Sequence, residues 1–162
     1  MDKGKYGRRD RLVQERRHDP YEPREKFPEP TVCPECGAVF IEGRWKWMDN
    51  PPEKANRALC PACRRIRDHL PAGRIILTGK FLETHGNEIM NLIKNEEHAE
   101  KAAHPLERIM EIDETPGRIT ILTTGIHVAR RIGEAVHNSY HGDFELQYGD
   151  AEKTVSISWH RD

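Results

Sequence analysis

Four cysteines in two closely spaced pairs constrain this chain more than any other feature. The pairs are Cys33-Pro34-Glu35-Cys36 and Cys60-Pro61-Ala62-Cys63, and they account for every cysteine in the sequence. Two residues between the thiols of a pair let both sulfurs reach one tetrahedral ion, and two such pairs complete a Cys₄ shell. We therefore predict a Zn²⁺ ion held by Cys33, Cys36, Cys60 and Cys63. Four thiolates leave no open coordination position, so this zinc would be structural rather than catalytic.

Paired disulfides and a redox Cys-x-x-Cys motif are the competing interpretations of the same cysteines. Disulfides need an oxidising compartment, whereas the chain begins Met-Asp-Lys-Gly-Lys with no apolar signal segment. No apolar run approaches the length of a membrane span. We therefore expect a cytoplasmic protein that does not associate with membranes.

Residues 31–72 are predicted to form the zinc unit. Gly37 follows the first pair and suits the positive φ of a tight knuckle, while Pro61 suits the first turn of a helix. The amides of that helix would point toward the thiolates. Residues 39–47 between the pairs read as a short hairpin. This order favours a treble clef over a two-knuckle zinc ribbon, and the few apolar residues imply that the metal supplies much of the folding free energy.

Two tryptophans, Trp45 and Trp47, flank Lys46 in the predicted hairpin. Such rings can stack on nucleic-acid bases. Strand alternation places both on one face, however, and aromatic side chains beside a zinc site more often cover its small core. The core role is the favoured interpretation.

The net charge of −1 conceals an asymmetry along the chain. Residues 1–32 carry nine Lys and Arg against seven Asp and Glu, residues 33–75 eight against five, and residues 76–162 nine against fifteen. The positive charge is therefore concentrated in the N-terminal half.

Residues 1–30 lack apolar periodicity and predict a disordered basic arm, which is either an RNA-binding segment or a solvated tail. Arginines on the neighbouring zinc unit favour RNA. The candidate RNA-binding residues are Arg8, Arg9, Arg11, Arg16, Arg17, Arg44, Lys46, Arg64, Arg65 and Arg67.

The rest of the chain predicts an α+β fold. Residues 73–104 read as a strand over 74–78 and a linking helix that closes at His104-Pro105. Residues 105–162 read as a small ββαββ sandwich domain. Its strands are expected at 109–112, 118–123, 144–148 and 155–159, with a helix that starts at Thr124-Gly125.

No catalytic constellation is found in the sequence. Apart from His137 and His141, its histidines form no His-x-x-x-His or His-Glu-x-x-His metal pair, and there is no glycine-rich phosphate loop. His137 and His141 could bind a second metal if a helix continued through them, but a helix-capping or surface role is favoured. The acidic residues Glu96, Glu97, Glu107 and Glu111 are read as a solvated face. We therefore expect a protein that is not an enzyme and has no small-molecule substrate.

A family resemblance is carried by two stretches. They are Thr31–Gly37 with Cys60–Cys63, and Ile119-Thr120-Ile121-Leu122-Thr123-Thr124-Gly125-Ile126-His127-Val128-Ala129-Arg130-Arg131-Ile132-Gly133. Residues 31–162 resemble the small bacterial relatives of the Nmd-three family, whose larger members are zinc-containing adaptors of the large ribosomal subunit. The resemblance implies contact with the ribosome, and it adds Arg130 and Arg131 as secondary RNA-binding candidates because it passes through them.

The sequence thus predicts a non-enzymatic zinc protein that binds the ribosome or ribosomal RNA, in assembly, quality control or stress. The alternative is a zinc-dependent protein-interaction or transcriptional adaptor, which the acidic C-terminal part of the chain permits.

Overall fold

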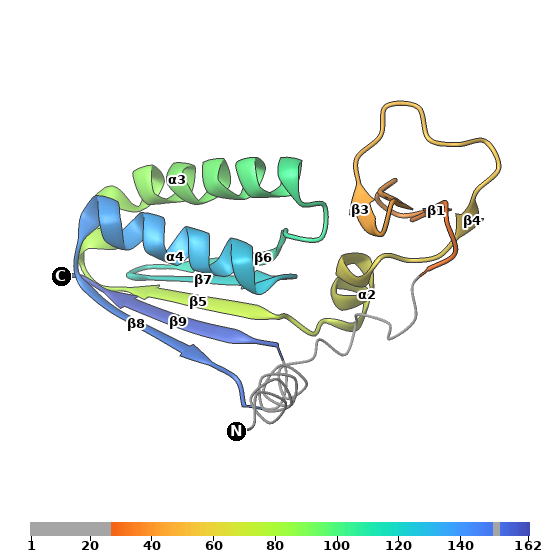
Figure 1. Ribbon diagram of the computed structural model, residues 1–162. Helices are drawn as coiled ribbons and strands as arrows, with labels where there is room; N and C mark the ends of the chain where they lie inside the picture. Colours follow the sequence, from red (N-terminus) through yellow and green to blue (C-terminus); the bar gives the residue numbers. More distant parts are fainter. Residues whose placement is uncertain (1–26, 151–152) are drawn as a thin grey trace, which may run out of the picture.

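The computed structural model describes residues 27–150 and 153–162 (Figure 1). These residues form two sheets, a small one around the cysteines and a larger one covered by helices. Most of the predicted basic arm lies outside the described residues. The same holds for five of its candidate RNA-binding residues, Arg8, Arg9, Arg11, Arg16 and Arg17.

The small sheet has the strand order β3-β2-β1-β4. Its antiparallel hairpin, β2 (Val39–Ile41) and β3 (Arg44–Lys46), confirms the hairpin predicted between the cysteine pairs. β1 (Thr31–Val32) pairs with β2, and β4 (Asn56–Arg57) adds to β1 in parallel. Strands of two residues carry no periodicity, so the sequence did not reveal β1 and β4.

Aromatic rings form part of the small core beside this sheet. Phe27, Phe40 and Trp45 pack against one another with centroid separations of 5.2 to 5.5 Å. Trp45 is buried, which confirms the core role predicted for it. The same prediction is wrong for Trp47, which follows the end of β3 and is 37% exposed. The two tryptophans therefore have different environments.

The larger sheet has five strands in the order β6-β7-β5-β9-β8. Its strands are β5 (Gly73–Thr78), β6 (Ile109–Thr115), β7 (Arg118–Thr123), β8 (Asp143–Tyr148) and β9 (Val155–His160). The central strand is β5, which pairs antiparallel with β7 and parallel with β9.

This strand order changes the organisation expected from the sequence. The predicted ββαββ unit over residues 105–162 supplies four of the strands, and the strand predicted over 74–78 is confirmed as β5, but it lies inside this sheet and not in a separate segment. Ile75 and Leu77 on β5 are fully buried. Because β5 separates β7 from β9, residues 105–162 alone would have a gap in the middle of the sheet. The alternation of apolar and polar residues along a strand indicates that one of its faces is buried, but it does not indicate which strands pair with it.

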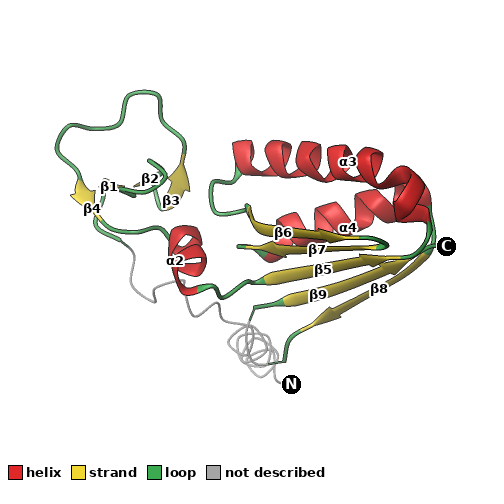
Figure 2. Ribbon diagram, turned by 180° about the vertical axis from the view of Figure 1, so that it is seen from behind, coloured by secondary structure: helices red, strands yellow, loops and turns green. Residues whose placement is uncertain are grey.

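Both long helices lie side by side over one face of the larger sheet (Figures 1 and 2). They are α3 (Phe81–Ala103), which stops before His104-Pro105 as predicted, and α4 (Ile126–Tyr140). The buried residues between helices and sheet include Ile89 and Ile93 of α3, Val128 and Ile132 of α4, and Trp159 of β9. Across the described part of the chain, no helix has both the length and the apolar character that a membrane span requires.

Candidate metal centre

The four cysteine sulfurs lie close together. All four lie within 4.8 Å of one another, and the sulfurs of Cys36 and Cys60 are 3.8 Å apart. A tetrahedral zinc with Zn–S bonds of about 2.3 Å would separate its sulfurs by about 3.8 Å. The arrangement therefore fits a four-coordinate metal ion, and the predicted Cys₄ cluster is confirmed. None of the four cysteines is in a disulfide.

The first cysteine pair is shaped by a tight backbone turn. The amide of Gly37 donates to the carbonyl of Cys33 at 2.9 Å, and the amide of Cys33 donates to the carbonyl of Ala38 at 2.9 Å. Gly37 has a φ of +82°, the left-handed conformation expected for this knuckle. The Ala38 amide also donates to the sulfur of Cys36 at 3.5 Å. This turn aims both sulfurs at the same point.

The second pair opens the short helix α2 (Pro61–Asp68). Cys60 is the N-cap, and its sulfur accepts a hydrogen bond from the Cys63 amide at 3.4 Å. Pro61 occupies the first turn, where its missing N–H is not needed. The positive end of the helix dipole therefore faces the thiolates, which favours their charged form.

Arg108 completes the centre from the other sheet domain. Its Nη2 donates to the sulfurs of Cys36 at 3.1 Å and Cys60 at 3.4 Å, and its Nη1 donates to that of Cys63 at 3.4 Å. The residue is only 7% exposed, and its Nε donates to the Pro105 carbonyl at 2.6 Å. A four-thiolate zinc site carries a net charge of −2, so this buried guanidinium offsets half of it.

Burial and hydrogen bonding shift the pKa values of the thiols and of Arg108. The hydrogen bond with Cys60 lowers the pKa of Cys36 most, and Arg108 lowers it further. The same bond, together with burial, raises the pKa of Cys60. Burial alone would lower the pKa of Arg108, but its hydrogen bond to Cys63 and the charges of the other thiols outweigh burial and raise it. Arg108 therefore remains a fixed cation beside the sulfurs.

Thr124 holds the segment that carries Arg108. Its amide donates to the Arg108 carbonyl at 2.8 Å, and the Arg108 amide donates to the Thr124 hydroxyl oxygen at 2.9 Å. That hydroxyl in turn donates to the Leu106 carbonyl at 2.6 Å. The Thr-Thr-Gly motif that begins the α4 region is thus a structural support for the metal centre.

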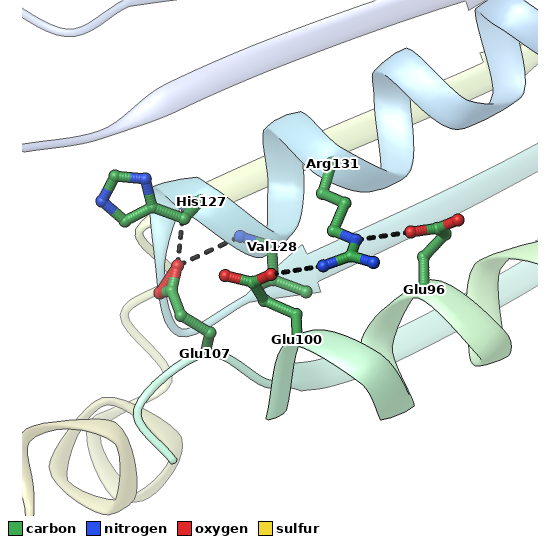
Figure 3. Close-up of polar contacts among 6 residues, drawn as sticks. All are labelled: Glu96, Glu100, Glu107, His127, Val128 and Arg131. Atoms are coloured by element: carbon green, nitrogen blue, oxygen red, sulfur yellow. Dashed lines mark hydrogen bonds and ion pairs between the residues drawn. The ribbon is translucent and has the colours of Figure 1, made fainter. Parts of the chain in front are cut away.

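The neighbouring Glu107 caps helix α4 (Figure 3). Its Oε1 accepts from the amides of His127 at 2.8 Å and Val128 at 3.0 Å. A Cβ on Gly125 would overlap the Glu107 carboxylate, so the close approach needs glycine at that position. Glu107 is 8% exposed, which corrects its assignment to a solvated face. Burial raises its pKa, against the opposing effect of the two amides.

Sequence reasoning missed Arg108 and Glu107 because their partners are distant along the chain. Arg108 lies 45 to 72 residues from the cysteines it contacts. Neither residue belongs to a spaced motif. A local pattern therefore gives no signal of their roles.

The arginines predicted on α2 do not form one surface set. Arg65 is 2% exposed, and its Nη1 donates to the Leu70 carbonyl at 2.9 Å. Because its guanidinium is buried and hydrogen-bonded within the protein, Arg65 is corrected from an exposed RNA-binding candidate to a structural residue. Arg67 is exposed and pairs with Asp68 at 3.0 Å, while Arg64 is half-buried.

The other described candidates lie on two separate elements. On β3, Arg44 is exposed and Lys46 pairs with Glu42 at 2.6 Å. On α4, Arg130 pairs with Glu134 at 3.5 Å. Figure 3 shows Arg131 reaching two carboxylates of α3, Glu96 at 2.6 Å and Glu100 at 2.9 Å. Arg130 and Arg131 are thus engaged in ion pairs within the protein.

A cleft of about 700 Å³ separates the zinc-binding sheet from the helices. Its walls come from β3 and the start of α2 on one side, and from the end of α3 and the start of α4 on the other. Its described lining includes Arg44, Lys46, Trp47, His104, Glu107, His127 and Lys153.

Comparison with known proteins finds no counterpart: no family model, curated protein or solved structure matches this chain.

Proposed function

We propose that this chain is a non-enzymatic, cytoplasmic zinc protein that binds the ribosome or ribosomal RNA. The observation that carries the zinc assignment is the cluster of four sulfurs within 4.8 Å of one another, three of which accept hydrogen bonds from Arg108. Thiolate ligands select a soft or borderline metal, and a closed Cys₄ shell is typical of structural zinc.

The charge around the metal centre supports an anionic partner. Arg44, Arg57 and Arg67 are exposed on the zinc unit, in a region where cations outnumber carboxylates eight to five. A metal-fixed scaffold would present these guanidinium groups to phosphates with little loss of conformational entropy. The resemblance of residues 31–162 to the Nmd-three family favours ribosomal RNA over other nucleic acids.

Metal analysis tests the first part of this proposal. Purified protein should hold one zinc per chain, and Cys60→Ser should lose it because a fourth thiolate is missing. Arg118→Ala, an exposed change on β7, is the matched control and should retain the metal. Full zinc content in Cys60→Ser would contradict the Cys₄ assignment.

Sedimentation with ribosomal subunits across a salt series tests the second part. Replacing Arg64 and Arg67 with Ala should weaken binding without loss of zinc. Each neutralised phosphate contributes roughly 0.7–0.9 to the log–log salt slope, so the double variant should flatten the slope by about 1.5 units. If Arg130→Ala with Arg131→Ala weakened binding instead, the contact surface would lie on α4.

A protein-interaction adaptor is the second candidate, and exposed apolar residues favour it. Trp47, Met48, Ile66 and Leu70 are the large hydrophobic side chains exposed among the described residues, and all belong to the zinc unit. Replacing Ile66 and Leu70 with Ser should abolish a protein contact but leave RNA binding unchanged. Binding that is insensitive to salt and lost in this variant would select the adaptor.

A further inference from the structure

The cleft beside the metal centre has the size and charge of a nucleotide site. Its volume of about 700 Å³ lies within the range of about 300–1,000 Å³ that small ligands occupy. Among the described residues that line it, Arg44, Lys46 and Lys153 are cations. The Glu42 carboxylate that pairs with Lys46 is exposed, so solvent screens the pair and it competes only weakly for the ammonium group.

The carboxylates among these lining residues are already engaged. Glu107 accepts the α4 amides of His127 and Val128. Glu100 accepts from Arg131 at 2.9 Å. Arg131 offsets the charge of Glu100, and the cations Arg44, Lys46 and Lys153 outnumber the two carboxylates among the lining residues, which favours a phosphate group over a cation.

Trp47 gives the cleft an aromatic surface whose position is fixed. Its indole Nε1 donates to the Lys101 carbonyl at 2.7 Å, and the Arg108 guanidinium lies 5.7 Å from its ring centroid. The small core does not require this ring, because Phe27, Phe40 and Trp45 fill it. A ring that is held by its polar end and still 37% exposed can stack on a base with little ordering cost.

We propose that this cleft holds an unpaired nucleotide of single-stranded RNA, with its base on Trp47 and its phosphate at Arg44, Lys46 or Lys153. This inference rests on the proposed function and locates its RNA contact. A duplex keeps its bases stacked and paired, so it has no free base to insert. A free mononucleotide shares the chemistry of base and phosphate, and the experiment separates the two sources.

Fluorescence anisotropy on the full, zinc-loaded chain tests the site. The probes are a labelled 12-nucleotide single-stranded RNA and a hairpin duplex, with AMP as competitor. Trp47→Ala should lose roughly 5- to 100-fold in affinity for the single strand, the effect of one stacked base. Trp47→Phe should recover much of it, and Lys46→Ala should flatten the salt slope. Met48→Ala and Arg118→Ala remove an exposed apolar group and an exposed charge elsewhere, so they should bind like the parent.

Each result decides between the proposals. Zinc content and thermal melting show whether each variant is folded. If Trp47→Ala does not fold, Trp47→Leu replaces it, because leucine keeps an apolar side chain but has no aromatic face, and it should lose affinity for the single strand in the same way. If the parent bound neither RNA nor ribosomes, both the proposed function and this site would fail. If the parent bound ribosomes while Trp47 and Lys46 variants bound equally well, the cleft alone would be refuted. AMP affinity equal to that of the oligonucleotide would also refute it, because the ligand would then be a free nucleotide.

Discussion

Arg108 links the metal centre to the larger sheet domain through one side chain. Its guanidinium donates to three cysteine sulfurs, while its backbone is held by Thr124. Hydrogen bonds of this kind orient metal ligands and stabilise their charge. The residue therefore contributes both to metal affinity and to the docking of the two sheets.

Substitutions of Arg108 should show how much of its effect on zinc affinity comes from its charge and how much from its hydrogen bonds to the sulfurs. Arg108→Ala leaves the thiolates without their buried cation, so we expect zinc affinity to fall by roughly 10- to 100-fold. Arg108→Lys keeps the charge but has no planar guanidinium to reach three sulfurs. The zinc affinity of this variant should lie between that of the parent and that of Arg108→Ala. Competition with a chromophoric chelator measures the series. Equal affinity in Arg108→Ala and the parent would show that the contacts have no energetic role.

Glu107 allows a second prediction, with a defined pH dependence. Burial raises the pKa of this carboxyl in the folded state. A raised pKa contributes stability below the unfolded value, and this contribution is lost as pH rises through the folded value. Glu107→Gln keeps an oxygen acceptor for the amides of His127 and Val128 and removes the titration. The parent should therefore lose stability relative to Glu107→Gln as the pH rises above the ordinary carboxyl range.

Glu107→Ala is the complementary variant at this position. It leaves two α4 amides uncapped in a buried place, so urea unfolding should show a loss of about 1–2 kcal/mol at pH 7. If both variants had the same stability across the pH range, the cap would be irrelevant and the buried charge would be the only effect.

At the scale of elements, the sequence predicts each long strand and helix but not how they assemble. The strand over 118–123 matches β7, and α4 begins just after Thr124-Gly125, because alternation and helical periodicity are local properties. The central place of β5 depends on pairing with β7 and β9, which are far along the chain. The cysteine cluster was predictable because its spacing is itself the signal, whereas Arg108 enters it from a separate segment.

The position of β5 makes a prediction about fragments. Residues 105–162 lack the strand between β7 and β9, so Ile121 and Ile157 would lose their neighbours on β5. We expect this fragment to melt without cooperativity, and a fragment of residues 71–162 to melt cooperatively. Circular dichroism on both, at matched concentration, measures the difference. A cooperative transition in the shorter fragment would show that β5 is dispensable.

At the scale of the whole molecule, two sheets with different sources of stability meet at the metal centre. The larger sheet has a buried apolar core from β5, β7, β9 and both long helices. The small sheet depends on a cluster in which cysteines are a major component. Contacts between them include the Arg108–sulfur bonds and the bond from Trp47 to the Lys101 carbonyl. Metal removal should therefore affect the two sheets differently.

Hydrogen exchange before and after chelation provides the test. Structural zinc supplies an apparent ~10–16 kcal/mol in small zinc-finger peptides, which is more than the small core around Phe40 could replace. Chelation should remove amide protection from residues 31–70, while β5 and β7 keep theirs because Ile75, Leu77 and Ile121 remain buried. Arg108→Ala with zinc bound should leave β5 and β7 protected too. Loss of protection throughout the chain in one step would instead mean that the sheets fold as a single cooperative unit, with the metal centre as part of the main core.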